Sequence, residues 1–200
     1  MREKLKFKKL LNEFRSLEYE LEYNSDILNE AGESFRALHD KWCEENNIDL
    51  SALASGGPSK TAAKQTQPKD DGSRVETKKA TSKHRDVFKS IAKKIHPDKI
   101  PEEDPRKDEF QEAFSKASSA MNEEEWGGLF DVIDRYDIEI SDYDEAILSL
   151  EEDIGRLKNK LQGQKSTYSW ILQNCNGDQS CIDMVMHAYM RQVFGWAPSE

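Results

Sequence analysis

The sequence predicts an all-α protein in which long coiled-coil helices, a small helical hairpin and a C-terminal helical hairpin are joined by a flexible linker. Apolar heptads run through two long segments, and the stretch between them begins with about thirty residues that have almost nothing to bury. Charged residues make up 34% of the chain and the apolar set only 36%, so we expect small packed units rather than one large core. Five segments are expected: residues 1–50, 51–82, 83–140, 141–165 and 166–200.

The N-terminal helix, predicted over residues 3–45, has the strongest periodic pattern in the chain. Its seam residues are spaced alternately three and four apart: Phe7, Leu10, Phe14, Leu17, Leu21, Asn24, Leu28, Ala31, Phe35, Leu38 and Trp42. Asn24 is the one polar member, a residue type that can fix register at some cost in stability. The seam favours a coiled coil over a binding groove. Its partner is either the helix at 142–164 or a second copy of the chain, which leaves a homo-oligomer open.

A linker and a basic helix follow. Residues 51–82 are rich in Ser, Thr, Ala, Gly and Lys, and this composition predicts a flexible linker. Thr81 or Ser82 is expected to cap a helix over residues 83–95, which Pro97 ends because the residue before a proline avoids helical angles. The inner stripe of that helix is His84, Phe88, Ile91 and Ile95.

A second helix of this hairpin is expected to begin with Asp104 as its cap and Pro105 at its first position. Its apolar stripe is Phe110, Phe114, Ala117 and Met121. Asn122, followed by three glutamates, is then interpreted as the start of another helix to about residue 136, although Gly127 and Gly128 weaken that pattern.

The C-terminal part is predicted to contain one long helix and two short ones. Ser141 is expected to cap a helix that ends near residue 164 and whose heptad seam is Tyr143, Ile147, Leu150, Ile154, Leu157 and Leu161. The tail divides at Asn176-Gly177-Asp178 into two short helices. Their aromatic and methionine residues favour core packing over an adaptable partner-binding surface: Tyr168, Trp170, Met184, Met186, Met190 and Trp196.

The three cysteines, Cys43, Cys175 and Cys181, form no CxxC pair, and the odd count predicts reduced thiols in a cytosol-like compartment. Cys175, Cys181 and His187 do not match a structural zinc spacing, so we expect no metal site. Asn176-Gly177-Asp178 lacks the later acidic ligands of a calcium loop and is interpreted as a turn. No nucleophile-base pair, phosphate loop or paired-carboxylate pattern is present, so neither enzymatic activity nor a cofactor is expected.

The hairpin carries the strongest functional pattern. Residues 81–100 hold six basic and two acidic side chains, and the basic helix runs directly into His96, Pro97 and Asp98. The basic helix, this tripeptide and the following helix with Phe110 together resemble the J domain of DnaJ-type co-chaperones over residues 83–121. His96, Pro97 and Asp98 match the family's signature tripeptide, and Lys99 matches its usual next residue. The resemblance implies docking on the acidic surface of a DnaK-type chaperone and stimulation of its ATP hydrolysis.

The chemistry of these residues suits that role. Pro97 stiffens the loop, and Asp98 presents a carboxylate that can accept a charge-assisted, bidentate bond from a partner arginine. His96 lies at the negative end of its helix, where its ring can satisfy a free carbonyl or carry charge. A steering field for an acidic partner would come from Arg85, Lys89, Lys93 and Lys94.

The sequence also departs from the family. The usual first helix, with its Tyr-x-x-Leu-Gly pattern, is absent before residue 83, and Ala117 stands where the third helix usually has an aromatic residue. The Gly/Phe-rich segment and the zinc-binding CxxC repeats are also absent. Because two short helices rarely bury enough surface alone, we expect the helix at 123–136 or the helix at 142–164 to cover the hairpin.

The leading hypothesis is therefore a cytoplasmic co-chaperone, whose coiled coil and tail select a client or a location. The alternative is a structural or scaffold protein of a larger assembly that retains a non-functional J-like hairpin, and an acidic nucleic-acid mimic ranks third. A net charge of −10 argues against nucleic-acid binding. No apolar run is long enough for a membrane span, and the N-terminus lacks a signal-peptide pattern.

Overall fold

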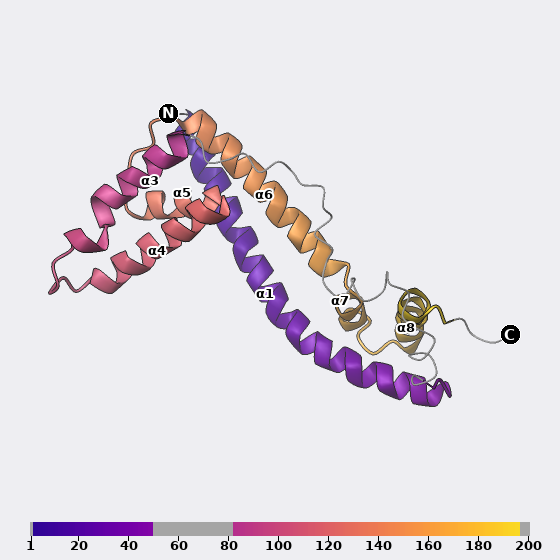
Figure 1. Cartoon of the computed structure of the whole chain (residues 1–200). Helices are drawn as coiled ribbons and strands as arrows, with labels where there is room; N and C mark the ends of the chain where they lie inside the picture. Colours follow the sequence, from indigo (N-terminus) through magenta and orange to yellow (C-terminus); the bar gives the residue numbers. More distant parts are fainter. Residues whose placement is uncertain (1, 50–81, 197–200) are drawn as a thin grey trace. The chain divides into compact units, whose positions relative to one another are not determined.

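The computed structural model describes residues 2–49 and 82–196, and within these ranges its regular elements are all helical (Figure 1). The elements are α1 (Arg2–Glu45), α3 (Ser82–Ile95), the short 3-10 helix η1 (Pro97–Lys99), α4 (Lys107–Glu123), α5 (Trp126–Arg135), α6 (Tyr143–Lys165), α7 (Tyr168–Gln173) and α8 (Gln179–Phe194). The predicted all-α class is confirmed. The predicted linker lies outside the described residues, except that Ser82 is already the first residue of α3.

The described residues form two compact units. Unit 1 comprises residues 2–19 and 82–158, and unit 2 comprises residues 20–49 and 159–196. Helices α1 and α6 each contribute to both units, so each long helix packs first against one set of partners and then against another.

The seam predicted for α1 is buried. Six of its members are almost fully buried: Phe7, Phe14, Asn24, Ala31, Phe35 and Trp42. The other five are half-buried, and a second row of buried residues lies beside them: Leu11, His39 and Cys43. The buried stripe is therefore wider than a two-stranded seam, as expected for a helix that packs on several partners.

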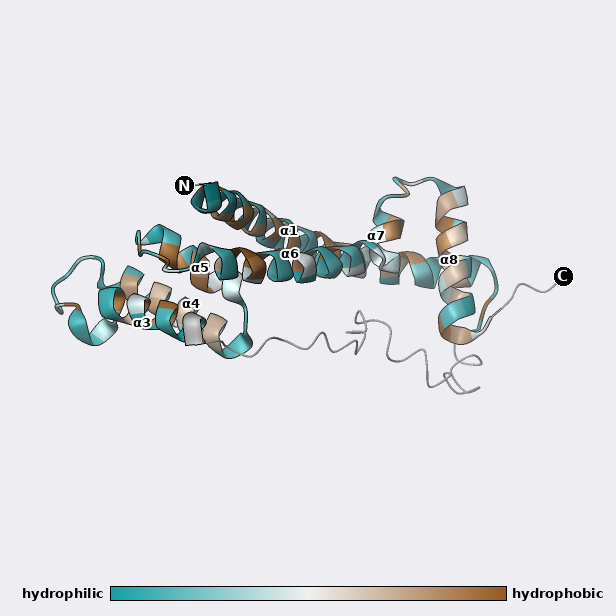
Figure 2. Cartoon of the chain, turned by 90° about the horizontal axis from the view of Figure 1, so that it is seen from above, coloured by the Kyte–Doolittle hydropathy of each residue, from teal (hydrophilic) through white to brown (hydrophobic). Residues whose placement is uncertain are grey.

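Helix α1 pairs with α6, and the two helices run in the same direction. In unit 1, Lys6 pairs with Glu151 at 2.8 Å and Glu13 with Lys158 at 2.7 Å. In unit 2, Glu20 pairs with Lys165 at 2.8 Å. Partners are 145 positions apart in every pair, and successive pairs are one heptad apart, which is the pattern of e and g positions in a parallel coiled coil. Hydrophobic and hydrophilic residues alternate along both helices (Figure 2). The helix predicted at 142–164 is thus the partner of α1.

One layer of this pair is polar. Asn24 of α1 is only 3% exposed, and Gln164 of α6 donates from Nε2 to the Leu21 carbonyl oxygen at 3.2 Å and to Ser25 Oγ at 2.9 Å. Gln164 therefore lies over the turn of α1 that carries Asn24. Within the described part of the chain, Asn24 Nδ2 and Gln164 Oε1 are buried and have no hydrogen-bond partner. We call Asn24 and Gln164 the polar layer.

In unit 1, α3 and α4 lie side by side and α5 packs against both (Figure 1). The two glycines of α5, which weakened its prediction, are required by this packing. A Cβ on Gly127 would lie 2.2 Å from the ring of Phe14, and the Gly127 N–H donates to Asp153 Oδ2 at 2.7 Å. A bare backbone is needed where α1 crosses α5.

Three predicted helix starts are wrong by a few residues. Asn122 does not begin a helix, because α4 continues to Glu123 and ends at Glu124, which has a φ of 57°. Asp104 instead accepts the Arg106 N–H at 2.8 Å in a turn that precedes α4. At the start of α6, Asp142 rather than Ser141 accepts the first free amide groups.

In unit 2, the second half of α1 packs with α7 and α8. The core is Phe35, Trp42, Cys43, Leu172, Cys175, Val185, Met186 and Met190. Trp42 Nε1 donates to Asp183 Oδ1 at 2.9 Å, which joins α1 to α8. The expected core role is confirmed for Met186 and Met190, whereas Met184 is 68% exposed. The chain's own helices therefore cover the α1 seam beyond its contact with α6.

Candidate partner-binding site

The loop between α3 and α4 holds His96, Pro97 and Asp98 in a defined conformation. His96 is extended (φ −62°, ψ 131°), as its position before Pro97 requires, and η1 follows directly. The Lys99 N–H donates to the His96 carbonyl at 2.9 Å, and the Ile100 N–H donates to the Pro97 carbonyl at 3.1 Å. The side chain of Asp98 is 88% exposed at this turn. The backbone of the loop is thus fixed by hydrogen bonds within the loop, and the Asp98 carboxylate is exposed to solvent.

The His96 ring closes the loop. Its Nδ1 accepts the Asp98 N–H at 3.2 Å, which caps η1, and the edge-to-face contact with Phe114 has a centroid separation of 4.8 Å. Nδ1 also lies 3.6 Å from Asp98 Oδ2. An acceptor Nδ1 has no proton, so this hydrogen bond corresponds to the tautomer with its proton on Nε2.

The predicted basic residues of α3 do not all behave alike. Arg85, Lys89, Lys93 and Lys94 are all exposed, and Lys89 makes a surface pair with Asp86 at 2.9 Å. Such exposed pairs contribute little to stability, so Lys89 can exchange its partner at low cost. Lys94 differs only in its partners, because its Nζ donates to the carbonyl oxygens of Tyr136 and Asp137, directly after α5. Lys94 therefore links α3 to the segment after α5 while it remains exposed to solvent.

The hairpin is anchored by a buried histidine that sequence reasoning had placed only in an apolar stripe. The ring of His84 stacks on Trp126 of α5 with centroids 3.8 Å apart, and its Nε2 lies 3.0 Å from Ser149 Oγ of α6. Burial lowers the pKa of His84, although Glu145 and Glu152 oppose the shift. Both helices expected to cover the hairpin therefore contact it.

A buried carboxylate ties the first segment of α1 to the same assembly. Asp131 of α5 is 5% exposed and accepts from Arg15 Nε at 2.7 Å and from Lys116 Nζ at 3.0 Å. Burial alone would raise the pKa of Asp131, but the bonds from Arg15 and Lys116 outweigh it and lower the pKa. This contribution of α1 was not predicted. A lone aspartate within the apolar run of residues 129–133 was the signal that a buried cation partner was needed.

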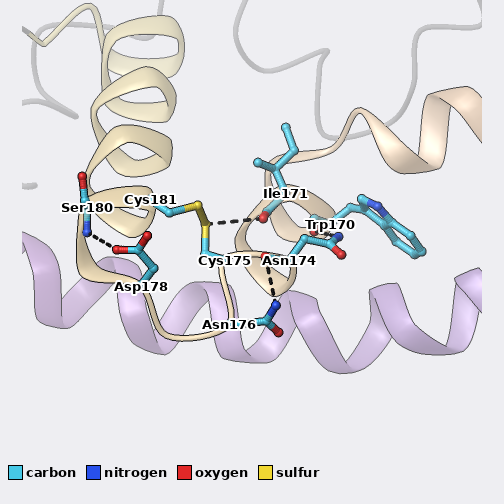
Figure 3. Close-up of a disulfide and its surroundings, with 8 residues drawn as sticks. All are labelled: Trp170, Ile171, Asn174, Cys175, Asn176, Asp178, Ser180 and Cys181. Atoms are coloured by element: carbon cyan, nitrogen blue, oxygen red, sulfur yellow. Dashed lines mark hydrogen bonds between the residues drawn. A yellow bond between two sulfur atoms is a disulfide. The ribbon is translucent and has the colours of Figure 1, made fainter.

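The expectation of three reduced thiols is wrong, because Cys175 and Cys181 form a disulfide (Figure 3). Their Cα atoms are 5.5 Å apart across the turn between α7 and α8, within the range that a disulfide spans. Asp178 caps α8 in this turn by accepting the Ser180 N–H at 3.0 Å. The bond removes both sulfurs as thiolate ligands and removes the argument from thiols for a cytosol-like compartment. Cys43 is a free, buried thiol, and burial raises its pKa.

Two further observations concern the described residues as a whole. No group of three or more His, Cys, Asp or Glu side chains in residues 2–49 and 82–196 is placed to hold a metal ion. In the same ranges, no helix has the length and apolar character needed to cross a membrane.

Comparisons with known proteins provide no assignment: no family model, curated protein or solved structure matches the chain.

Proposed function

We propose that this chain is a J-type co-chaperone that docks on a DnaK-type chaperone through α3 and stimulates ATP hydrolysis through the loop of His96, Pro97 and Asp98. The observation that carries the proposal is the Asp98 carboxylate, which is 88% exposed on a braced loop directly after an exposed basic helix. Arginine is the natural partner for such a group, because its guanidinium can donate two parallel bonds to one carboxylate.

The loop is suited to triggering because little conformational freedom remains to be lost on docking. Pro97 fixes one backbone angle, and the His96 ring holds the Asp98 amide. A group that is already ordered in its bound geometry retains more of its interaction energy as affinity.

The set of basic residues that we assign to docking differs from the set that the sequence predicted. Arg85, Lys89, Lys93 and Lys99 are exposed and can face an acidic partner. Lys94 is exposed too, but its Nζ is already bonded to the carbonyl oxygens of Tyr136 and Asp137. We therefore assign steering to the first four residues and a structural role to Lys94.

The absent first helix of the J domain is compensated in this proposal by the chain's own helices. His84 joins the hairpin to α5 and α6, and Asp131 joins α5 to α1 and α4. These contacts supply the covering surface that two short helices need.

The remaining parts of the proposal concern client and compartment. We assign to unit 2 the selection of a client or location. We assign the protein to the cytoplasm, where the disulfide of Cys175 and Cys181 would be reduced and unit 2 would depend on its apolar core. The scaffold alternative predicts that the hairpin only packs and stimulates nothing.

Steady-state ATP hydrolysis by a DnaK-type chaperone tests the proposal. We expect the wild-type protein to raise the rate and Asp98→Asn to abolish the increase, because a desolvated charge partner is worth about 2–5 kcal/mol. Asp144→Asn, the same change at an exposed position of α6, is the matched control and should stimulate like wild type. Equal stimulation by wild type and Asp98→Asn, with matching melting curves, would reduce the tripeptide to a helix stop.

A further inference from the structure

Three aromatic rings connect the hairpin to its loop. Phe88 of α3 and Phe114 of α4 have ring centroids 5.6 Å apart, and Phe114 lies 4.8 Å from the ring of His96 at an interplanar angle of 66°. Phe114 thus touches both the opposite helix and the first residue of the tripeptide. It is half-buried, so it is not a deep core residue whose loss would collapse the unit.

The Phe114 contact determines where the His96 ring can lie. The side chain of His96 is 36% exposed, and its hydrogen bond runs from Nδ1 to the Asp98 N–H. This bond forms only when the ring lies in the plane that points Nδ1 at that amide. An edge-to-face neighbour favours one orientation of a flat ring, which a flexible aliphatic side chain cannot do equally well.

We propose that Phe114 is the positioning residue of the loop: it orients His96, whose Nδ1 then fixes the Asp98 backbone and aims the carboxylate. The inference rests on the proposed function for its biological meaning, but its structural part concerns only Phe114, His96 and the Asp98 amide. Phe114 itself touches no partner in this mechanism and acts through His96.

The chain offers a matched control one turn earlier on the same helix. Phe110 is 7% exposed, packs on Tyr136 with centroids 5.5 Å apart and lies under the Arg106 guanidinium at 4.7 Å. Phe110→Leu should therefore lower the melting temperature at least as much as Phe114→Leu. Because Phe110 packs on Tyr136 rather than on His96, its loss should leave the loop unchanged. Phe114→Tyr keeps the ring and should rescue the loop.

The experiment has three readouts on the full chain. The ring nitrogens of His96 are observed by long-range ¹H–¹⁵N correlation, together with hydrogen exchange at the Asp98 amide, and ATPase stimulation is measured in parallel. We expect Phe114→Leu to shift the His96 nitrogens, to speed exchange at Asp98 and to lower stimulation about three- to tenfold, the range expected for one lost aromatic pair. Phe110→Leu and Phe114→Tyr should match wild type in all three.

The outcomes separate the two proposals. Unchanged His96 nitrogens and unchanged Asp98 exchange in Phe114→Leu would overturn the positioning role, whatever the ATPase assay shows. A loosened loop with wild-type stimulation would also overturn it, because positioning would then have no consequence. If wild type itself stimulates nothing, the co-chaperone proposal fails, and the positioning of His96 is decided by the nuclear magnetic resonance data alone.

Discussion

Asn24→Leu should make the protein more stable and less selective in its pairing. Asn24 is 3% exposed and its Nδ2 has no partner among the described residues. An unsatisfied buried donor costs about 1–3 kcal/mol, so its removal should raise the unfolding free energy by about 2 kcal/mol. For a unit of this size, that corresponds to roughly 8–16 °C in melting temperature. Asn29→Leu, the same change at an exposed site of α1, should stay within about 0.5 kcal/mol of wild type.

The loss of Asn24 from the polar layer should change the mass of the protein in solution. In wild type, α6, α7 and α8 of the same chain cover the α1 seam, so we expect one chain per particle. Without Asn24 the seam is apolar throughout and also suits a second copy or a shifted register. Thermal melting by circular dichroism and sedimentation equilibrium over a hundredfold concentration range would report the two effects. A melting temperature below that of wild type would show instead that Asn24 is hydrogen-bonded in the folded protein and stabilises it.

Three further changes should alter the stability of the protein, each for a reason that lies in a single group or contact. Burial lowers the pKa of His84, so its contribution to the free energy of unfolding should be complete above about pH 6.5. The free energy of unfolding should then fall by up to about 1.4 kcal/mol per pH unit as the pH drops towards the folded-state pKa. Urea titrations at several pH values should show this slope in wild type and not in His84→Gln. Gly127→Ala should lower the free energy of unfolding by more than about 2 kcal/mol, because the added Cβ would lie 2.2 Å from the ring of Phe14. Gly155→Ala, with open space around the added Cβ, should raise it by about 0.5–1 kcal/mol. Equal melting temperatures of the two variants would contradict the packing of α5. Unit 2 should lose about 2 kcal/mol of stability, and remain folded, when the disulfide is reduced or when Cys175 and Cys181 are both changed to Ser. Complete loss of helicity in unit 2 would show that its apolar core alone is insufficient.

The sequence predicted the helices themselves better than the contacts between them. The α1 seam and the loop at Pro97 were readable because a heptad and a proline act locally. Pairing of α1 with α6 depends on residues far apart in the chain, although the charges were informative in retrospect. Lys6, Glu13 and Glu20 recur every seven residues, as do Glu151, Lys158 and Lys165 with opposite signs.

Other features were beyond the reach of sequence patterns. The disulfide depends on a Cα separation across a turn, which residue spacing alone does not determine. The bonds of Lys94 to the carbonyl oxygens of Tyr136 and Asp137 could not be predicted, because these residues lie about forty positions later in the chain. The helix starts shifted because several residues near each end can cap, and local geometry selects one of them.

The decisive measurement of co-chaperone activity is single-turnover ATP hydrolysis by a DnaK-type chaperone that is mixed with increasing amounts of this protein. We expect wild type to raise the maximal rate. The double change of Lys89 and Lys93 to Glu should raise the half-saturating concentration, most strongly at low salt, with the maximal rate retained. Asp98→Asn should melt like wild type and leave the maximal rate at the level of the chaperone alone. Acceleration by Asp98→Asn equal to that of wild type would rule out a triggering role for the Asp98 carboxylate. No acceleration by wild type at any concentration would rule out a co-chaperone role altogether.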